Sequence, residues 1–170
     1  MRAARYPGTP WQLRRRLLAV LALILAWPPL VTAAGSPQLP RADNLAADAA
    51  RMRAARIPLL VLYSQADCHW CEVVRRDHLL PLLERPGGDA QLLLRQVDID
   101  SDRPLIDFAG SRTTHRAFAR REGAKLTPTL AVYGPDGRRL AEPLVGVRIP
   151  DYYGAYIERL IEQAHRNLER

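Results

Sequence analysis

One stretch, residues 58–71, restricts the possible folds of this chain more than any other. It begins with an apolar run, Pro58-Leu59-Leu60-Val61-Leu62-Tyr63, bounded by a proline. Such a run is typical of a strand that is buried on both faces. Small and polar residues follow and end in Cys68-His69-Trp70-Cys71, after which apolar residues recur at helical spacing over residues 73–82. The sequence therefore places two cysteines at the turn from a buried strand into a helix.

This placement gives the cysteines distinct properties. The first N–H groups of a helix are free, and the helix dipole favours a negative charge beside them. A thiol at that point, as predicted for Cys68, ionises more readily than a free cysteine, whose pKa is roughly 8.5. Cys71 lies one helical turn further on, within reach of a disulfide. A bridge that closes so short a loop stabilises a fold only weakly, so the pattern favours a redox-active pair over a structural one.

The N-terminus has the order of a secretory signal peptide. Arginines without acidic residues are followed by the apolar run Leu17–Trp27, two prolines and the small residues Ala33-Ala34. The apolar run is shorter than the roughly 20 residues that cross a bilayer. We therefore predict a cleaved signal over residues 1–34, with a retained N-terminal membrane anchor as the alternative. Residues 35–42 are predicted to be a flexible lead-in.

The remaining residues, 43–170, have the length of one domain. The whole chain has a net charge of +7, but five of its 25 basic residues and none of its 18 acidic residues lie in the predicted signal. The 20 basic and 18 acidic residues that remain give a net charge of +2, which does not favour nucleic acid as a partner. The mature chain is expected to have no integral membrane span.

Periodicity predicts an α/β fold with the element order α-β-α-β-α-β-β-α. The expected result is a four-stranded mixed sheet flanked by helices, with an N-terminal helix and an insertion before the third helix. Pro81 is expected to kink or end the helix after Cys71, and residues 100–112 to form an inserted loop with a short helical turn. The other expected elements are helices over 44–56, 113–121 and 151–168, and strands over 91–99, 127–133 and 138–145.

In this order of elements the chain resembles the thioredoxin superfamily from Asp43 to Leu168. The resemblance rests on the CxxC pair after a buried strand, on Thr127-Pro128 at the start of the strand before a hairpin, and on Gly146 followed by an amphipathic helix. With the signal peptide and the insertion, it is most similar to exported bacterial thioredoxin-related (SoxW-like) proteins.

The resemblance implies thiol–disulfide exchange with protein substrates in the periplasm and requires no cofactor. It implies that Cys68 is the attacking thiol, that Cys71 resolves the mixed disulfide, and that a cis bond precedes Pro128 and faces the cysteines. A membrane or periplasmic redox partner would exchange electrons with the pair. The resemblance favours a reductant, and a periplasmic oxidant or isomerase is the alternative.

Four further positions are predicted to bind substrate or tune the pair. His69 is placed to stabilise the Cys68 thiolate, or is a solvated residue, and the charge of Asp67 opposes ionisation. Trp70 is a contact for substrate or packs over the turn. The backbone of Thr127 is expected to pair with a substrate strand.

The chain also departs from thioredoxin itself. Thioredoxin has tryptophan before the first cysteine and Gly-Pro between the pair, where this chain has Asp67 and His69-Trp70. Thioredoxin also buries an acid six residues before the first cysteine, and that position is Leu62 here. The carboxylate that moves protons to the second cysteine is therefore missing or supplied from elsewhere.

Two other classes of function remain open. Cys68, Cys71 and His69 or His78 form a chemically plausible soft metal site, although no second cysteine pair exists. A binding domain with incidental cysteines is the other class. The remaining candidates are assigned to ordinary positions: His78, His115 and His165 at the surface of helices or half-buried, Arg120-Arg121 on a solvated face, and Tyr152, Tyr153 and Tyr156 in the core and rim of the last helix.

Overall fold

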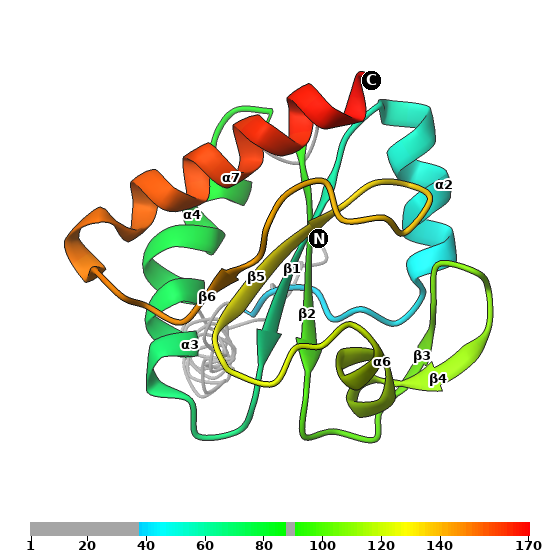
Figure 1. The fold of residues 1–170 in the computed structure, drawn as a ribbon, viewed down its shortest axis with the longest axis horizontal. Coiled ribbons are helices and arrows are strands. Elements are labelled where there is room, and N and C mark those ends of the chain that lie inside the picture. Colours follow the sequence, from blue (N-terminus) through cyan, green and yellow to red (C-terminus); the bar gives the residue numbers. More distant parts are fainter. Residues whose placement is uncertain (1–37, 88–90) are drawn as a thin grey trace, which may run out of the picture. The chain divides into compact units, whose positions relative to one another are not determined.

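The computed structural model describes residues 38–87 and 91–170, so the predicted signal peptide and residues 35–37 of the lead-in lie outside it. Its centre is a four-stranded sheet in the order β2-β1-β5-β6 (Figure 1). β1 (Leu59–Ser64) runs parallel to β2 (Leu93–Asp98) and antiparallel to β5 (Thr129–Tyr133), which pairs antiparallel with β6 (Leu144–Val145). The predicted mixed sheet is confirmed.

Helices cover both faces of this sheet (Figure 1). Alternation along β1 sends Val61 and Tyr63 into the core beneath α2 (Leu45–Ala55) and α6 (His115–Arg121). Leu60 and Leu62 point into the other core, beneath α3 (His69–Val74), α4 (Leu80–Glu84) and α7 (Tyr153–Leu168). We call the second side the cysteine face, because α3 begins at the CxxC pair, and the first side the opposite face.

The segment before α2 differs from the flexible lead-in that the sequence predicts. Its described part is attached to the sheet: the Gln96 N–H donates to the Pro40 carbonyl at 2.9 Å, and the Ala42 N–H donates to the Gln96 carbonyl at 3.0 Å. Leu39 and Ala42 are buried, so apolar contacts hold the segment as well. The cap of α2 is Asn44, whose side chain accepts the Ala47 N–H at 2.9 Å.

The helix after the cysteines passes through Pro81 instead of ending there. α3 continues into η1 (Arg75–Leu79), a π-helical turn in which the Leu80 N–H reaches the Arg75 carbonyl, and then into α4. Proline has no N–H to donate, and the change of hydrogen-bond register places Pro81 in the first turn of α4, where a missing N–H costs little. The helix therefore does not stop at Pro81, and a π turn precedes the proline.

The insertion after β2 is a hairpin, where the sequence suggested a loop. β3 (Pro104–Ile106) pairs antiparallel with β4 (Arg112–Thr114) in a second, two-stranded sheet. Buried Asp107 closes the turn by accepting the N–H groups of Ala109 and Ser111, at 3.0 and 2.9 Å. Arg121 pairs with the same carboxylate at 2.8 Å, so it is an anchor of the hairpin and not part of a purely solvated face.

The expected fourth strand is shorter than predicted. The tight turn at 134–137 forms, with the Gly137 N–H on the Gly134 carbonyl at 3.0 Å. Pairing beyond it is limited to an isolated bridge between Tyr133 and Arg139 and to β6 itself. Pro143 precedes β6 and cannot donate to the ladder.

The last helix is preceded by a 3-10 turn, η2 (Pro150–Tyr152), and Asp151 lies in that turn without capping α7. Tyr153 is buried and Tyr152 is exposed, so the two tyrosines divide between core and rim as predicted. Across the described residues, no helix has the combination of length and apolarity that crossing a membrane requires.

Candidate active site

The two cysteines lie where the sequence places them. β1 ends at Ser64, a short turn follows, and Cys68 is the N-cap of α3, with its Sγ accepting the Cys71 N–H at 3.2 Å. Asp67 before it has a φ of 55°, in the left-handed region. The Ala66 N–H donates to a carboxylate oxygen of Asp100 at 2.9 Å, which fastens the turn to the chain that follows β2.

Cys68 and Cys71 are joined by a disulfide, with an S–S distance of 1.98 Å and their Cα atoms 5.2 Å apart. The two residues differ in accessibility: Cys68 is partly exposed, whereas Cys71 is 1% exposed. An incoming thiolate or disulfide can therefore reach Cys68, while Cys71 is covered by the protein.

The residues beside the pair are turned to solvent. Asp67 and His69 are exposed, and 43% of the Trp70 surface is accessible. The His69 ring packs edge-on against Trp70, with ring centroids 5.5 Å apart. Trp70 therefore does not pack over the turn as a buried side chain, and its contact fixes one side of the His69 ring.

Thr127 and Pro128 lie at the same end of the sheet as the cysteine turn. Thr129 pairs with Tyr63, so the residues before Thr129 lie opposite the end of β1 from which the turn emerges. The Thr127–Pro128 peptide bond is cis, as expected. The Gly146 N–H donates to the Pro128 carbonyl at 2.8 Å. Within residues 38–87 and 91–170, neither the N–H nor the carbonyl of Thr127 bonds to another backbone group.

Sequence reasoning missed two exposed apolar residues near this end of the sheet. Leu126, 64% exposed, accepts a hydrogen bond from the Thr129 hydroxyl through its carbonyl. Val145 is 40% exposed and pairs with Thr129 across β5 and β6. The signal available in the sequence was an apolar residue next to each of the family's markers, Thr127-Pro128 and Gly146.

A buried polar network on the cysteine face was also missed. Arg75, in the turn after α3, donates to the Gln96 side-chain carbonyl at 3.0 Å and pairs with the carboxylate of Glu72. Gln96 faces Leu62 across the parallel pair of strands, and Leu62 is fully buried. A cation and an amide thus lie near the position where the resemblance leads one to expect an acid.

The histidines do not form a metal centre. His78 packs against the Tyr153 ring with centroids 5.5 Å apart, and His115 is fully buried, not at the helix surface. Over the described part of the chain, no three His, Cys, Asp or Glu side chains gather as ligands. The metal-handling hypothesis therefore lacks a third ligand among these residues.

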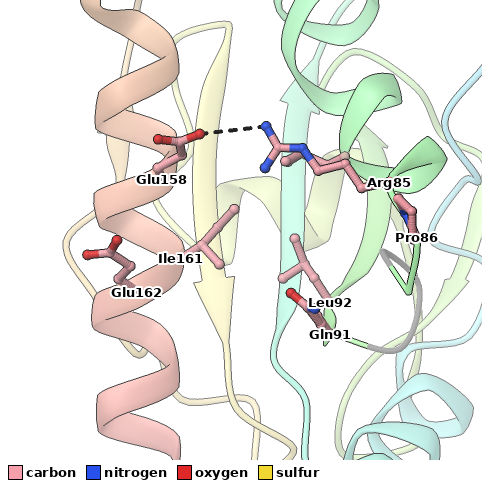
Figure 2. A pocket seen from close by; sticks show the side chains of 8 residues that line it. Arg85, Pro86, Gln91, Leu92, Glu158, Ile161 and Glu162 are labelled. Atoms are coloured by element: carbon pink, nitrogen blue, oxygen red, sulfur yellow. Dashed lines mark ion pairs between the residues drawn. The ribbon is translucent and has the colours of Figure 1, made fainter.

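The cavity in Figure 2 lies between α4 and α7 and has a volume of about 340 Å³. Arg85 and Glu158 form an ion pair of 3.6 Å across it. None of the residues that line it belongs to the predicted site. We therefore place the candidate site at the surface around the disulfide and not in this cavity.

The arrangement can be compared with known proteins. Residues 45–161 match the model of a family described as a thioredoxin-like domain, and this match covers most of the chain. The chain belongs to this family. The thioredoxin-like fold, together with the Cys68–Cys71 disulfide at a helix N-terminus, gives it the active-site arrangement of a thiol–disulfide oxidoreductase.

Several solved structures are similar to the chain. A thioredoxin-fold protein from Helicobacter pylori has 15% identity and a TM-score of 0.50, with 65% of this chain and 72% of that chain covered. Mitochondrial thioredoxin 3 from Saccharomyces cerevisiae has 15% identity and a TM-score of 0.49, with coverages of 73% and 93%. The C-terminal domain of Neisseria meningitidis DsbD has 18% identity and a TM-score of 0.45, with coverages of 67% and 90%. No curated protein matches the chain.

Proposed function

We propose that this protein is an exported reductant that transfers electrons from its Cys68–Cys71 pair to disulfides of other proteins. The observation that carries the proposal is the difference between the two sulfurs: Cys68 is partly exposed at the N-cap of α3, and Cys71 is buried one turn later. An exposed thiolate can attack a large substrate, and a buried thiol beside it can then resolve the mixed disulfide.

The reaction balances over two steps. The Cys68 thiolate attacks one sulfur of the substrate disulfide, which forms a mixed disulfide and releases the first substrate thiolate. Cys71 then loses its proton and attacks Cys68 Sγ, which forms the Cys68–Cys71 bond and releases the second substrate thiolate. Both released thiolates take up protons from water. Two electrons have moved from the protein to the substrate, and the disulfide state of the structure is the product.

Proteins are the substrate class that fits the surroundings of Cys68. Trp70, Leu126 and Val145 offer exposed apolar side chains on the segments that meet at this end of the sheet. Thr127 offers backbone groups that no other described backbone group occupies. An extended polypeptide can pair with such a backbone and pack its side chains on the apolar residues.

Export is supported by the order of charged, apolar and small residues over 1–34, which lie outside the described residues. An exported reductant needs a continuing supply of electrons, so we propose a membrane or periplasmic redox partner that reduces the pair. The similarity to SoxW-like exported proteins is part of the same proposal. Fractionation of cells that make the full chain, with N-terminal sequencing of the product, tests both export and cleavage.

Reduction of insulin by the purified protein, with dithiothreitol as the electron source, tests the exchange activity. We expect Cys68→Ser to abolish turnover, and Cys71→Ser to accumulate mixed disulfides with insulin, because the attack proceeds but nothing resolves its product. Full turnover by Cys68→Ser would contradict the assignment of the nucleophile.

The direction of electron flow is tested separately by equilibrating the pair with glutathione buffers. Known proteins with this fold range from about −270 mV for a reductant to about −120 mV for a strong oxidant. We expect a value at the reducing end. A potential near the oxidising end would make the oxidant alternative correct while leaving the exchange activity intact.

A further inference from the structure

Arg75 is unusual among the charged residues of this chain. Within the described ranges, 38–87 and 91–170, it is the one buried arginine or lysine. The other buried side chains of the Asp, Glu, His, Lys and Arg classes, Asp48, Asp107 and His115, lie in α2, the β3–β4 hairpin and α6, on the opposite face. Burial of a cation costs free energy unless specific partners compensate it, so the partners of Arg75 must be identified.

The guanidinium of Arg75 is held by two partners. Its Nε donates to Gln96 Oε1 at 3.0 Å, and its terminal nitrogen pairs with a carboxylate oxygen of Glu72. Gln96 is itself oriented, because its amide nitrogen donates to Asp98 at 2.6 Å and leaves the oxygen for Arg75. The cation is therefore fixed against β2, on the side of the sheet where α3 lies.

Cys71 shares this position on the helix. The Arg75 N–H donates to the Cys71 carbonyl, so the two residues are one turn apart on the same side of the helix, and both are buried. The ion pair with Glu72 does not fully neutralise the charge of Arg75. The Glu72 side chain is 49% exposed and that of Arg75 is 9% exposed, so water screens the carboxylate much more than the guanidinium. The guanidinium is therefore the less screened of these two charges, one helical turn from buried Cys71.

We propose that Arg75 is a positioning residue for the second step of exchange, where it stabilises the thiolate that forms on Cys71. The inference rests on the proposed function, because only an exchange reaction makes Cys71 a nucleophile. In that step the Cys71 thiol gives its proton to water, its sulfur bonds to Cys68 Sγ, and the bond from Cys68 to the substrate sulfur breaks. The negative charge is on Cys71 before the attack and on the departing substrate thiolate after it.

Water has access to Arg75. A polar cleft of about 610 Å³ lies beside the cysteine turn, and Arg75 and Gln96 line it together with Gln65 and Ala66 of the turn. A proton released near Arg75 can therefore pass to water in this cleft. With a cation to hold the thiolate and water to take the proton, the step needs no buried carboxylate at the position of Leu62.

The first test measures the pKa of Cys71 in a Cys68→Ser background, from the ultraviolet absorbance of the thiolate against pH. We expect Arg75→Met to raise this pKa by about one unit, in line with a partly screened charge at an effective dielectric constant of about 20. Arg75→Lys keeps the cation and should keep most of the effect. Arg76→Met is the matched control, because the neighbouring Arg76 is exposed and pairs with Asp77; it should leave the pKa unchanged.

The second test separates the two steps of exchange in single-turnover experiments at pH 7. A rise of about one unit reduces the thiolate fraction of Cys71 about tenfold, but a more basic thiolate is also more nucleophilic, with a Brønsted coefficient of about 0.4–0.5. Resolution of the mixed disulfide by Arg75→Met should therefore slow by roughly threefold to fourfold. Alkylation of Cys68, which reports the first nucleophile, should not change. A merely structural defect would not select the second step.

The Glu72→Gln variant shows whether Arg75 stabilises the Cys71 thiolate itself or only holds Glu72 as a proton acceptor. If Arg75 stabilises the thiolate directly, removing the opposing carboxylate lowers the pKa of Cys71 or leaves it unchanged. If Arg75 only holds Glu72 as a proton acceptor, Glu72→Gln slows resolution as much as Arg75→Met does, and the proposal is wrong. An unchanged Cys71 pKa in Arg75→Met also overturns it. The pKa test needs no turnover, so a parent protein that fails to reduce insulin would contradict the proposed function without deciding this inference.

Discussion

The two faces of the central sheet bury different kinds of side chain. On the cysteine face, β1 and β5 contribute aliphatic residues such as Leu60, Leu62 and Leu130, and the buried charge there is Arg75. On the opposite face, the same strands contribute Tyr63 and Tyr133, and the elements packed against them hold paired ionisable groups. One strand can serve both faces because successive side chains point to opposite sides.

This contrast separates the residues that stabilise the fold from the residues that act on the disulfide. The polar groups of the opposite face are bonded to one another: Tyr63 to Tyr133 at 2.6 Å, Tyr133 to Glu122 at 3.1 Å, and Arg95 to Asp48 at 2.5 Å. The Tyr63–Tyr133 and Arg95–Asp48 links join residues that are 70 and 47 positions apart in the chain. We therefore expect substitutions on the opposite face to change the free energy of unfolding and leave the disulfide chemistry unchanged, and substitutions around the cysteines to do the reverse.

The largest expected effect on stability comes from Phe118→Ala in α6. Phe118 is 1% exposed, and its ring lies 6.4 Å from that of Tyr63 and 6.3 Å from that of Phe108. Deleting a buried phenylalanine costs about 3–5 kcal/mol, because both burial and packing are lost. Urea unfolding of the oxidised protein measures the loss. A change in the reduction potential of the Cys68–Cys71 pair by more than about 10 mV, equivalent to about 0.5 kcal/mol, would contradict the separation of the two faces.

Substitutions in the tyrosine pair should cost less stability than Phe118→Ala, and Tyr133→Phe should cost more than Tyr63→Phe. Tyr133→Phe removes the middle of the chain from Tyr63 to Glu122 and leaves the buried Tyr63 hydroxyl without its partner, at a cost of about 1–3 kcal/mol. Tyr63→Phe leaves Tyr133 bonded to Glu122 and should cost only about 1 kcal/mol. Unfolding curves of both variants, measured side by side, give the order. Equal losses would show that the cluster is not a chain of bonds.

Burial explains why these hydroxyls stay protonated. Burial raises the pKa of Tyr63 well above its usual range and raises the pKa of Tyr133 to about 12. Both hydroxyls are therefore neutral donors and acceptors near neutral pH, and their titration adds no pH dependence to stability there.

Elements with a long apolar pattern were predicted from the sequence, and short elements were not. The cysteine turn, β1, β2 and α7 were predictable because their apolar residues recur with the period of a strand or a helix. The β3–β4 hairpin was not, because its strands have three residues each and are held by tertiary contacts, such as the bridge between Asn44 and Ile106. Strands of three residues are too short to show a periodicity.

Arg75 was missed for a related reason. A charged residue in an amphipathic pattern is assigned to the solvated side, and only the position of Gln96 on β2 shows why a guanidinium is buried there. The π turn was missed because it depends on how the chain accommodates Pro81, and sequence alone allowed a kink or a stop. The sequence thus located the disulfide but not the polar groups packed behind it.

His115 predicts a pH dependence that belongs to the opposite face. It is fully buried, and its Nδ1 accepts the Asp98 N–H at 2.9 Å. Burial lowers its pKa, a trend that Arg103 reinforces and that Asp98 and Asp43 oppose. His115 is therefore protonated near pH 6.5 in the unfolded chain, whereas in the folded chain it stays neutral to lower pH. Stability is fully present above that pH and is lost as the pH falls toward the lower pKa of the folded state, by at most about 1.4 kcal/mol per pH unit.

His115→Asn is the variant that checks this origin. Asparagine offers an oxygen that can accept the same N–H and does not titrate, so the difference in stability between this variant and the parent should change between pH 6.5 and 5. Urea midpoints of the two proteins, measured across that range, give the result. Parallel curves would assign the acid sensitivity to other groups, with the carboxylate of Asp107 the first to examine because hydrogen bonds from Ser111 and Arg121 outweigh its burial and lower its pKa.

The smallest expected effects are on the cysteine face, at the exposed residues that flank Cys68. His69→Ala should raise the pKa of the Cys68 thiol by a few tenths of a unit, because it removes a donor or cation from beside the thiolate, and Asp67→Asn should lower it by a similar amount. Exposure limits both effects, since interactions between exposed charges contribute less than about 1 kcal/mol. Thiolate absorbance against pH in a Cys71→Ser background measures them, and unfolding curves should not move. If both variants titrate like the parent, the first turn of α3 alone sets the acidity of Cys68, and the contact of His69 with Trp70 holds its ring away from the sulfur.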